Sequence, residues 1–384
     1  MSAARSRATA AAGHTRRPAQ EAGGGPAVPP VGDDDVAEPL AVAFGRVRAP
    51  DVVVAVSRAG RRHIASGGTA PAPRAPRDHL VYELGSLTKT FTVLLLADLA
   101  TRGVLGLDDP VTAHLPGLPV RHPATHKITL RHLATHTAGL PRVPRDLVPS
   151  ALLHPTRNGY AGYTRERLLD AFARTRPRHE PGAHWHYSNL GTALLGPALE
   201  AAAGAPYPDL LARHVLAPLG LASATTARPG PAAGPPEARV PALGRRGDGR
   251  TPMPPTDMAA FAAAGALRAD PLDLLTYAEA HLRPEKTPLA EALRVVRVPQ
   301  LRRGTGRRHT HTLGWYQHPA AEGPLLFHAG ATFGQQSFAG FHPATGTAVA
   351  AVATRHDRRC AVVQAGYTLL HELASLGPHS APVA

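Results

Sequence analysis

The sequence is poor in cysteine, in long apolar runs and in aromatic residues. A single cysteine, Cys360, excludes an internal disulfide and is typical of a reducing compartment. No run of roughly 18 uncharged apolar residues is present, so we expect no transmembrane helix. The N-terminal region also lacks the apolar segment of a secretory signal. We therefore expect a cytoplasmic protein, with an extracytoplasmic location as the alternative.

Lysine is also scarce, and the positive charge comes almost entirely from arginine. The chain has 39 arginines but only 3 lysines, and its formal net charge is +14. A strongly basic chain is a candidate for nucleic-acid binding. The arginines are scattered, however, apart from a cluster at 302–303 and 307–308, and aromatic residues make up only 5%. A general bias toward Ala, Arg, Pro and Gly explains the charge, and we expect no nucleic-acid partner.

The 384 residues are enough for one domain with two lobes. Residues 1–38 are rich in Ala, Gly, Pro and Arg, which predicts a disordered tail, with a cryptic export signal as the alternative. Residues 39–376 form the predicted domain, and 377–384 form a second tail.

Strand patterns lie near both ends of the predicted domain, and helical patterns lie between them. A β run at 51–57 and its partner at 62–66 indicate a hairpin. Further short β runs and a final helix are predicted at 312–317, 325–328, 337–342, 347–354 and 362–376. The segment 228–257 is rich in Pro and Gly and is interpreted as a surface excursion.

This order predicts an α+β fold of the α/β sandwich type. An antiparallel sheet built from N- and C-terminal strands and flanked by helices forms one lobe, at about 39–85 plus 301–376. A mostly helical lobe is inserted at about 86–300.

The most informative motif is Ser86-Leu87-Thr88-Lys89, at the start of a strongly apolar helix pattern. Residues three apart on a helix share one face, so the two side chains are close enough to touch. An amine held neutral by burial accepts the proton of a serine hydroxyl, which is a weak nucleophile by itself. The pair is therefore a candidate Ser-Lys nucleophile, with a capping serine and an incidental lysine as the alternative.

A second candidate element is Tyr187-Ser188-Asn189, just before another helix pattern. Residues two apart in an extended segment point to the same side. A tyrosine near a cation can act as a general base and then as an acid. Asn189 can orient the lysine or hold a substrate carbonyl. The alternative is a core tyrosine followed by a helix cap.

A third element is the strand segment His328-Ala329-Gly330-Ala331. A glycine lets the strand backbone approach a reacting carbonyl, and the next N–H, that of Ala331, can point at a developing oxyanion. His328 can offer a cationic or donating edge to a substrate. A structural strand histidine is the alternative.

Together the three elements resemble the serine β-lactamase and penicillin-binding-protein superfamily, in its branch of class C β-lactamases, D-alanyl-D-alanine carboxypeptidases and esterases. That family has S-x-x-K, Y-x-N, and K-T-G or H-x-G in this order. The segments at 103–111 and 128–141 and the pair Gly314-Trp315 are also similar to family segments. The resemblance covers roughly residues 40–376.

The resemblance implies a β-lactamase/transpeptidase-like fold and a serine hydrolase that acts through an acyl-enzyme on an ester, amide or β-lactam. Ser86 would be the nucleophile, Lys89 and Tyr187 would share proton transfer, and Asn189 would position lysine and substrate. The backbone N–H groups of Ser86 and Ala331 would form the oxyanion hole. The family's lysine and threonine are replaced by His328 and Ala329, which favours an esterase or amide hydrolase over efficient β-lactam turnover.

Other functions stay open at this stage. A catalytically silent binding protein and an acyltransferase would share the same motifs. A metallohydrolase is suggested by three histidine pairs with ligand-like spacing but no accompanying carboxylate. The pairs are His132/His136, His184/His186 and His309/His311. We expect no metal and no cofactor.

Overall fold

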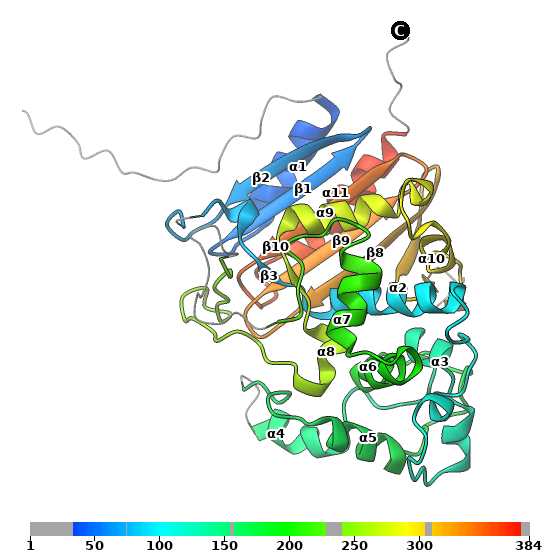
Figure 1. Cartoon of the computed structure of the whole chain (residues 1–384). Helices are drawn as coiled ribbons and strands as arrows, with labels where there is room; N and C mark the ends of the chain where they lie inside the picture. The colour runs from blue at the N-terminus through cyan, green and yellow to red at the C-terminus, as the bar shows by residue number, and fades with distance from the viewer. Residues whose placement is uncertain (1–33, 74, 154–156, 228–239, 304–308, 378–384) are drawn as a thin grey trace, which may run out of the picture.

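The computed structural model describes residues 34–73, 75–153, 157–227, 240–303 and 309–377. Its centre is an eight-stranded sheet in which each neighbouring pair is antiparallel, in the order β2-β1-β10-β9-β8-β7-β6-β5 (Figure 1). The strands are β1 (Val52–Arg58), β2 (Arg61–Gly67), β5 (Leu301–Arg303), β6 (His309–His311), β7 (Tyr316–Ala320), β8 (Gly323–Ala331), β9 (Gln336–His342) and β10 (Thr347–Ala353). The predicted antiparallel sheet built from both ends of the chain is confirmed.

Strands β1 and β10 are apolar at almost every position because both faces of the sheet are covered. All seven residues of each strand are buried. Side chains alternate between the two faces of a strand. Accordingly, Val53 and Ala350 belong to one apolar cluster, whereas Val54 and Ala351 belong to the other. The sheet is therefore the middle layer of a sandwich.

The predicted hairpin is also present, as β1 and β2. The two residues that connect the strands, Ala59 and Gly60, both have positive φ, at 51° and 80°. Two left-handed residues in a two-residue turn match the right-handed twist of the strands. The turn therefore sets the pairing of Arg58 with Arg61.

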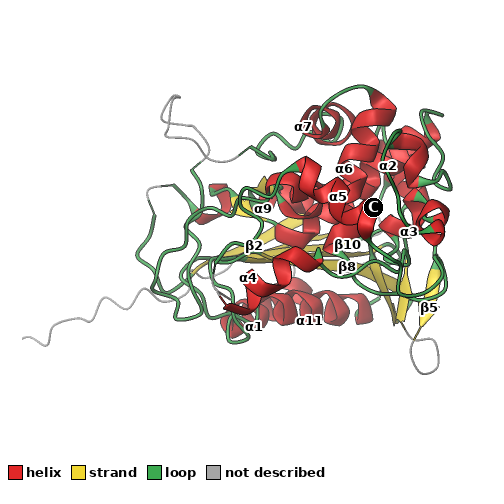
Figure 2. Ribbon diagram, turned by 90° about the horizontal axis from the view of Figure 1, so that it is seen from below, coloured by secondary structure: helices red, strands yellow, loops and turns green. Residues whose placement is uncertain are grey.

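One face of the sheet is covered by α1 (Asp34–Arg46) and α11 (Val362–Ser375), which lie side by side in Figures 1 and 2. The prediction of a helix at 362–376 is therefore confirmed. Residues 34–38, which their composition assigned to a disordered tail, are instead the first turns of α1. Val36, Leu40 and Phe44 recur every fourth position and are buried. The surrounding alanines and prolines make this apolar stripe difficult to recognise in the sequence. Residues 1–33 lie outside the described part of the chain.

The other face of the sheet is covered by α9 (Pro271–Ala280), which packs against β1 and β10 (Figure 1). Its apolar residues Leu274, Leu275 and Ala278 are buried in the same cluster as Val53. This helix belongs to the range 86–300 that the sequence assigned to the helical lobe. Spatially it is part of the sandwich, so that assignment needs correction.

The remaining described helices build the second lobe, most of which lies below the sheet in Figure 1, with α10 beside the sheet. They are α2 (Thr88–Thr101), α3 (Leu130–Ala134), α4 (Val148–Leu153), α5 (Arg165–Arg174), α6 (Asn189–Ala203), α7 (Tyr207–Leu211), α8 (Ala262–Gly265) and α10 (Ala290–Val295). Helix α2 is buried along almost its whole length, from Thr88 to Leu99, and packs against α6, α8 and α10. A helix that is apolar all round is central to a fold, so α2 is the axis of this lobe.

The described part of the proline-rich segment, 240–257, lies largely at the surface, as its composition predicts, but it is anchored to the fold at a few buried positions. The backbone N–H of Ala242 donates to the Val81 carbonyl at 2.9 Å, and Ala242 is buried. The N–H of Thr256 donates to the Glu83 carboxylate at 2.6 Å. These bonds hold the segment against the short strand pair β3 (Tyr82–Glu83) and β4 (Arg268–Ala269). Residues 228–239 lie outside the described residues.

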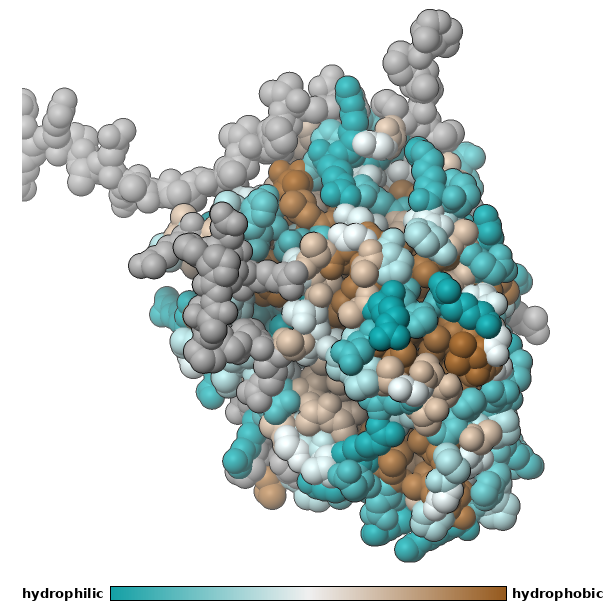
Figure 3. Space-filling model, viewed as in Figure 1, coloured by the Kyte–Doolittle hydropathy of each residue, from teal (hydrophilic) through white to brown (hydrophobic). Residues whose placement is uncertain are grey.

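The surface in Figure 3 mixes hydrophilic and hydrophobic side chains, with apolar groups scattered in small patches. Such scattered exposure is ordinary for a folded protein. Among the described residues, no helix has the length and apolar character needed to span a bilayer.

Candidate active site

Ser86 lies in a tight 3-10 turn, Gly85–Leu87, that leads directly into α2. The turn is wedged against the end of β8. Gly85 has φ of +51°, and a Cβ at this position would lie 2.5 Å from the carbonyl oxygen of Ala331. Only glycine fits so close an approach. The sequence Gly85-Ser86 therefore places the serine hydroxyl where a helix start meets a strand end.

Lys89 lies one turn after Ser86, with its Nζ 3.2 Å from Ser86 Oγ. The amine is buried among the apolar side chains of α2, and its other hydrogen-bond contact is the carbonyl of Ala264, at 2.7 Å. Burial lowers the pKa of Lys89, since a charged amine loses its hydration there. The predicted contact between Ser86 and a buried lysine amine is therefore present in the geometry.

Tyr187 lies on the extended segment before α6 and reaches the same serine. Its O–H donates to Ser86 Oγ at 2.8 Å, and Lys89 Nζ lies 5.2 Å from the centroid of its ring. The next residue, Ser188, caps α6 by accepting the N–H of Gly191 at 2.9 Å, and its hydroxyl donates to the Pro141 carbonyl at 2.6 Å. This cap fixes the backbone that carries the tyrosine.

Asn189 lines the same cleft but does not hold the lysine, as the sequence had suggested. Its Nδ2 donates to the hydroxyl of Tyr160 at 2.8 Å. The lysine contact expected of Asn189 is made instead by the Ala264 carbonyl. The Oδ1 of Asn189 is buried and has no hydrogen-bond partner in the described structure.

The histidine of the third element is not a cationic group. The side chain of His328 is buried, stacks on Tyr316, and its Nδ1 lies 2.8 Å from the Ala329 carbonyl. Burial and the nearby Lys89 lower the pKa of His328 to about 3. The imidazole is therefore neutral near pH 7, which corrects the expectation of a cationic edge for substrate.

Gly330 allows β8 to press against the segment that leads to Ser86. A Cβ on Gly330 would lie 1.9 Å from the carbonyl oxygen of Leu84. The close approach is thus made by the protein's own chain, and it brings the Ala331 backbone beside Gly85 and Ser86. Both proposed oxyanion donors, the N–H groups of Ser86 and Ala331, belong to these adjoining segments.

His136, which the sequence singled out only as part of a histidine pair with ligand-like spacing, is a neighbour of the site. Its ring centroid lies 4.6 Å from that of Tyr187, and its Nδ1 accepts the N–H of Ser188 at 3.3 Å. Burial keeps its pKa well below the usual value. A neutral ring in this place supports the face of Tyr187. Its place in the His136-Thr137-Ala138-Gly139 segment is the signal in the sequence.

Arg142 is a second residue that the sequence did not single out. The carbon of its guanidinium lies 5.1 Å from the centroid of the Tyr187 ring. Its carbonyl accepts the N–H groups of Asn189, at 2.8 Å, and Leu190, at 3.2 Å. Among 39 arginines nothing distinguished this one, except that it directly follows the Gly139-Leu140-Pro141 segment.

Apart from Lys89 and His136, these residues border one open cleft of about 570 Å³. Aromatic side chains make up much of its wall, and they are contributed by Tyr160, Trp185, Tyr316 and Phe333. Among the described residues that line it, none is aspartate or glutamate, and Arg142 is the single arginine or lysine. The cleft is therefore largely apolar, with its polar groups gathered around Ser86.

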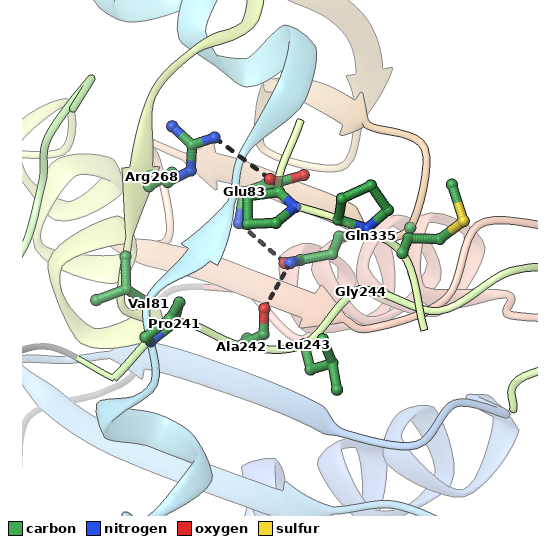
Figure 4. Close-up of a pocket in the computed structure, with 12 residues that line it drawn as sticks. Val81, Glu83, Pro241, Ala242, Leu243, Gly244, Arg268 and Gln335 are labelled. Atoms are coloured by element: carbon green, nitrogen blue, oxygen red, sulfur yellow. Dashed lines mark hydrogen bonds and ion pairs between the residues drawn. The ribbon is translucent and has the colours of Figure 1, made fainter. Parts of the chain in front are cut away.

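A buried network behind Ser86 holds the strand that leads to it (Figure 4). The Glu83 carboxylate accepts from Arg268 at 3.3 Å and from the Thr256 hydroxyl at 2.7 Å. Gln335 accepts the Glu83 N–H at 2.9 Å and donates to the Ala242 carbonyl at 3.0 Å. These bonds tie together β3, β4 and the turn after β8. They fix the chain segment that precedes Ser86, as α2 fixes the segment that follows it.

The histidine pairs form no metal site in the described part of the chain. No group of three or more His, Cys, Asp or Glu side chains there is arranged to hold a metal ion. His132 accepts the N–H of Thr129 at 3.2 Å in a helix cap. His309 contacts His318 at 3.0 Å, whereas His311 accepts from Arg303 at 2.8 Å.

Comparison with known proteins gives the same family throughout. The sequence model described as Beta-lactamase matches residues 34–372. The chain is 31% identical over 163 residues to Penicillin-binding protein 4* of Bacillus subtilis (strain 168), which covers 38% of this chain and 31% of that protein. It is 35% identical over 167 residues to the D-alanyl-D-alanine-carboxypeptidase/endopeptidase AmpH of Escherichia coli (strain K12), covering 43% and 42%. The chain thus spans less than half the length of these relatives.

Solved structures share the fold over a longer stretch. A class C beta lactamase from Rhodobacter sphaeroides superposes with a TM-score of 0.72 at 24% identity, covering 89% of this chain and 100% of that one. A second class C beta-lactamase gives a TM-score of 0.71 at 22% identity, covering 90% and 96%. The predicted β-lactamase/transpeptidase-like architecture is therefore confirmed.

Proposed function

This chain belongs to the beta-lactamase family, and we propose that it is a serine hydrolase that cleaves an ester or amide through an acyl-enzyme. One observation carries the proposal. Ser86 Oγ lies within hydrogen-bond distance of both a buried amine, Lys89, and a phenol, Tyr187, at 3.2 and 2.8 Å. A nucleophile, a base and an acid in mutual contact, at the wall of an open cleft, are the parts that acyl transfer needs.

In the first step, Lys89 acts as the general base. A neutral amine has two hydrogens and one lone pair. One hydrogen is donated to the Ala264 carbonyl, which leaves the lone pair for the proton of Ser86. The serine oxygen then attacks the substrate carbonyl carbon, and a tetrahedral oxyanion forms. The lowered pKa of Lys89 keeps the amine in its accepting form.

The negative charge of that intermediate falls between the helix start and the strand end. We assign its stabilisation to the backbone N–H groups of Ser86 and Ala331. The support for this is the packing of Gly85 directly against Ala331, which leaves no room for a side chain between the two segments. Loss of one such donor typically costs about 2.7–4 kcal/mol of transition-state stabilisation.

Tyr187 completes the cycle. Its hydroxyl donates a proton to the leaving alcohol or amine as the C–O or C–N bond breaks. The Lys89 ammonium formed in the first step then returns a proton to the tyrosine, so the charges balance. Water, deprotonated by the same pair, hydrolyses the acyl-serine. An acyltransferase would differ only in using another nucleophile at this last step.

The proposed substrate class follows from the side chains that β8 lacks. His328 is neutral and bonded to its own neighbour, and Ala329 has no hydroxyl, so β8 has no charged or hydroxyl side chain to hold a substrate carboxylate. We therefore propose esters and amides as the main substrates, and expect slow turnover of β-lactams. The D-alanyl-D-alanine peptides named for AmpH are a third class to test.

Intact mass spectrometry tests the proposal. A fluorophosphonate should add one adduct to the protein, and the same treatment of Ser86→Ala should add none. Exposure to a short-chain ester, a cephalosporin and a D-Ala-D-Ala peptide then shows which acyl-enzyme accumulates. A wild-type protein that is folded and yet unlabelled, or equal labelling of Ser86→Ala, would overturn the assignment and favour a silent binding protein.

A further inference from the structure

We infer that Arg142 is the anion-recognition residue of the cleft, so that preferred substrates carry a carboxylate close to the scissile carbonyl. The inference rests on the proposed acyl-enzyme function and names its substrate class. Arg142 lines the same cleft as Ser86. Its guanidinium carbon lies 5.1 Å from the ring centroid of Tyr187, and the hydroxyl of that tyrosine contacts Ser86. The cation is thus one tyrosine side chain away from the nucleophile.

The position of Arg142 is set by its backbone and not by an acidic partner. Its carbonyl accepts the N–H groups of Asn189 and Leu190, the first residues of α6. The preceding carbonyl, of Pro141, accepts the hydroxyl of Ser188. The loop is therefore bonded to the same helix start that carries Tyr187. A guanidinium held in this way is preorganised for a ligand.

The guanidinium of Arg142 is unpaired among the described residues, in contrast to other arginines of this lobe. Arg131 is paired with Asp108 at 2.7 Å, and Arg167 with Asp146 at 2.9 Å. The side chain of Arg142 is exposed and makes no ion pair or hydrogen bond within the described structure. Its five N–H donors are free for a planar carboxylate, which binds such a fork in a bidentate manner.

Arg142 is the single arginine or lysine in the described wall of the cleft, and the two basic groups nearest Ser86 are engaged elsewhere. His328 is buried with its Nδ1 facing the Ala329 carbonyl, and Lys89 is engaged with Ser86 and Ala264. No acidic side chain among the described lining residues would repel an anion. A second guanidinium, of Arg303, stacks 3.6 Å from the ring centroid of Trp185, which also lines the cleft. The surroundings of Tyr187 are therefore positively charged.

Two activated esters of similar length and opposite charge character test the inference. 4-Nitrophenyl hydrogen glutarate has a terminal carboxylate, whereas 4-nitrophenyl hexanoate is neutral. We expect wild-type protein to have the higher kcat/KM for the glutarate. In Arg142→Gln the ratio of the two kcat/KM values should fall roughly tenfold, the typical loss of one charge-assisted hydrogen bond; an effect of the lost charge on Lys89 or Tyr187 acts on both esters and leaves this ratio unchanged. Arg142→Lys should keep part of the preference.

Arg145→Gln is the matched control, because Arg145 is an exposed arginine three residues away that does not line the cleft. It removes the same formal charge and should leave the ratio unchanged. A ratio that is the same in Arg142→Gln as in wild type, or an equal drop in Arg145→Gln, would overturn the inference.

Binding separates this inference from the proposed function. If neither ester is hydrolysed, the hydrolase assignment fails, and isothermal titration of Ser86→Ala protein with the glutarate ester decides the role of Arg142. We expect Kd to rise roughly tenfold when Arg142→Gln is added to Ser86→Ala. Equal Kd values for the single and double variants would show that Arg142 does not recognise the anion.

Discussion

The hydroxyl of Tyr187 donates to the hydroxyl oxygen of Ser86 at 2.8 Å, although the two residues are 101 positions apart in the chain. The serine belongs to the start of α2 and the tyrosine to the segment before α6. Lys89 contacts the same oxygen from within α2. Ser86, Lys89 and Tyr187 are thus held together by the starts of two helices, α2 and α6.

Replacing Lys89 by methionine should abolish the base while preserving the packing. Methionine has a similar length and suits an apolar site. The substitution also removes the cost of burying an amine that would be hydrated in the unfolded chain. We expect the rate of Ser86 labelling by a fluorophosphonate to fall about 10²–10⁴-fold, with a Tm equal to or above that of wild type. A labelling rate close to wild type would show that another group takes the serine proton.

Tyr187→Phe should remove the acid and leave the ring. The phenyl group still packs against His136, whose ring centroid lies 4.6 Å away. We expect kcat/KM for a neutral ester to fall about 10²–10⁴-fold. The control is Tyr367→Phe on α11, which removes a phenol hydroxyl that contacts His318 far from the cleft. Equal effects of the two variants would remove the case for a catalytic phenol.

Activity should be lost as pH falls through the lowered pKa of Lys89. Burial lowers this pKa from its ordinary value, so the amine is neutral, and able to accept a proton, at pH values where a solvent-exposed lysine is charged. Single-turnover acylation measured from pH 5 to 9 should therefore show an acid limb in which the rate falls tenfold per pH unit. The same limb should be absent from the residual rate of Lys89→Met, and its presence there would assign it to another group.

Folding stability should also fall on acidification, because of histidines buried in the neutral form. Burial lowers the pKa of His281 to about 3 from an ordinary value of 6.5. Between these two values the unfolded chain binds a proton that the folded chain does not, so the free energy of unfolding rises with pH across this window. Each pH unit below 6.5 should cost up to about 1.4 kcal/mol for this group. Urea unfolding at several pH values should show a shallower slope for His281→Gln, and an unchanged slope would contradict the assignment.

Gly330→Ala should damage the site through its backbone. The added Cβ would lie 1.9 Å from the Leu84 carbonyl oxygen, so β8 or the segment before Ser86 has to move. We expect a loss of about 1–3 kcal/mol in the free energy of unfolding, together with slower labelling of Ser86. In Gly45→Ala, where nothing lies within 4 Å of the new Cβ, stability should be unchanged or rise by up to about 1 kcal/mol. Similar effects of both substitutions would argue against a special close approach at β8.

The contact between Ser86 and Lys89 could be predicted because the signal that places them together is local. The three-residue spacing of Ser86 and Lys89 puts both on one side of a helix start, whatever the rest of the chain does. The period-two strands and the turn residues likewise predicted most of the sheet, since β-branched runs and tight turns leave few alternatives. What joined these pieces was the resemblance to a family, and not periodicity.

The contacts that define specificity could not be predicted, since they depend on which side chains meet across the lobes. Asn189 is bonded to Tyr160, and Lys89 to Ala264, through contacts that no spacing indicates. The neutral state of His328 follows from burial, which the sequence does not report. Arg142 could not be singled out because the chain has 39 arginines. The richness in Ala, Gly, Pro and Arg also led to the first turns of α1 being assigned to a disordered tail.

The pairing of β1 with β10 joins Val52 to Ala353, residues from opposite ends of the fold. This junction cannot close on the ribosome until nearly the whole domain has been made. A chain that stops before β10 would leave the edge of β1 opposite to β2 unpaired, with the valines of β1 open to solvent. Contacts so distant along the chain are typical of slow folders. During synthesis, the hairpin of β1 and β2 is therefore the part of this protein most in need of protection from aggregation.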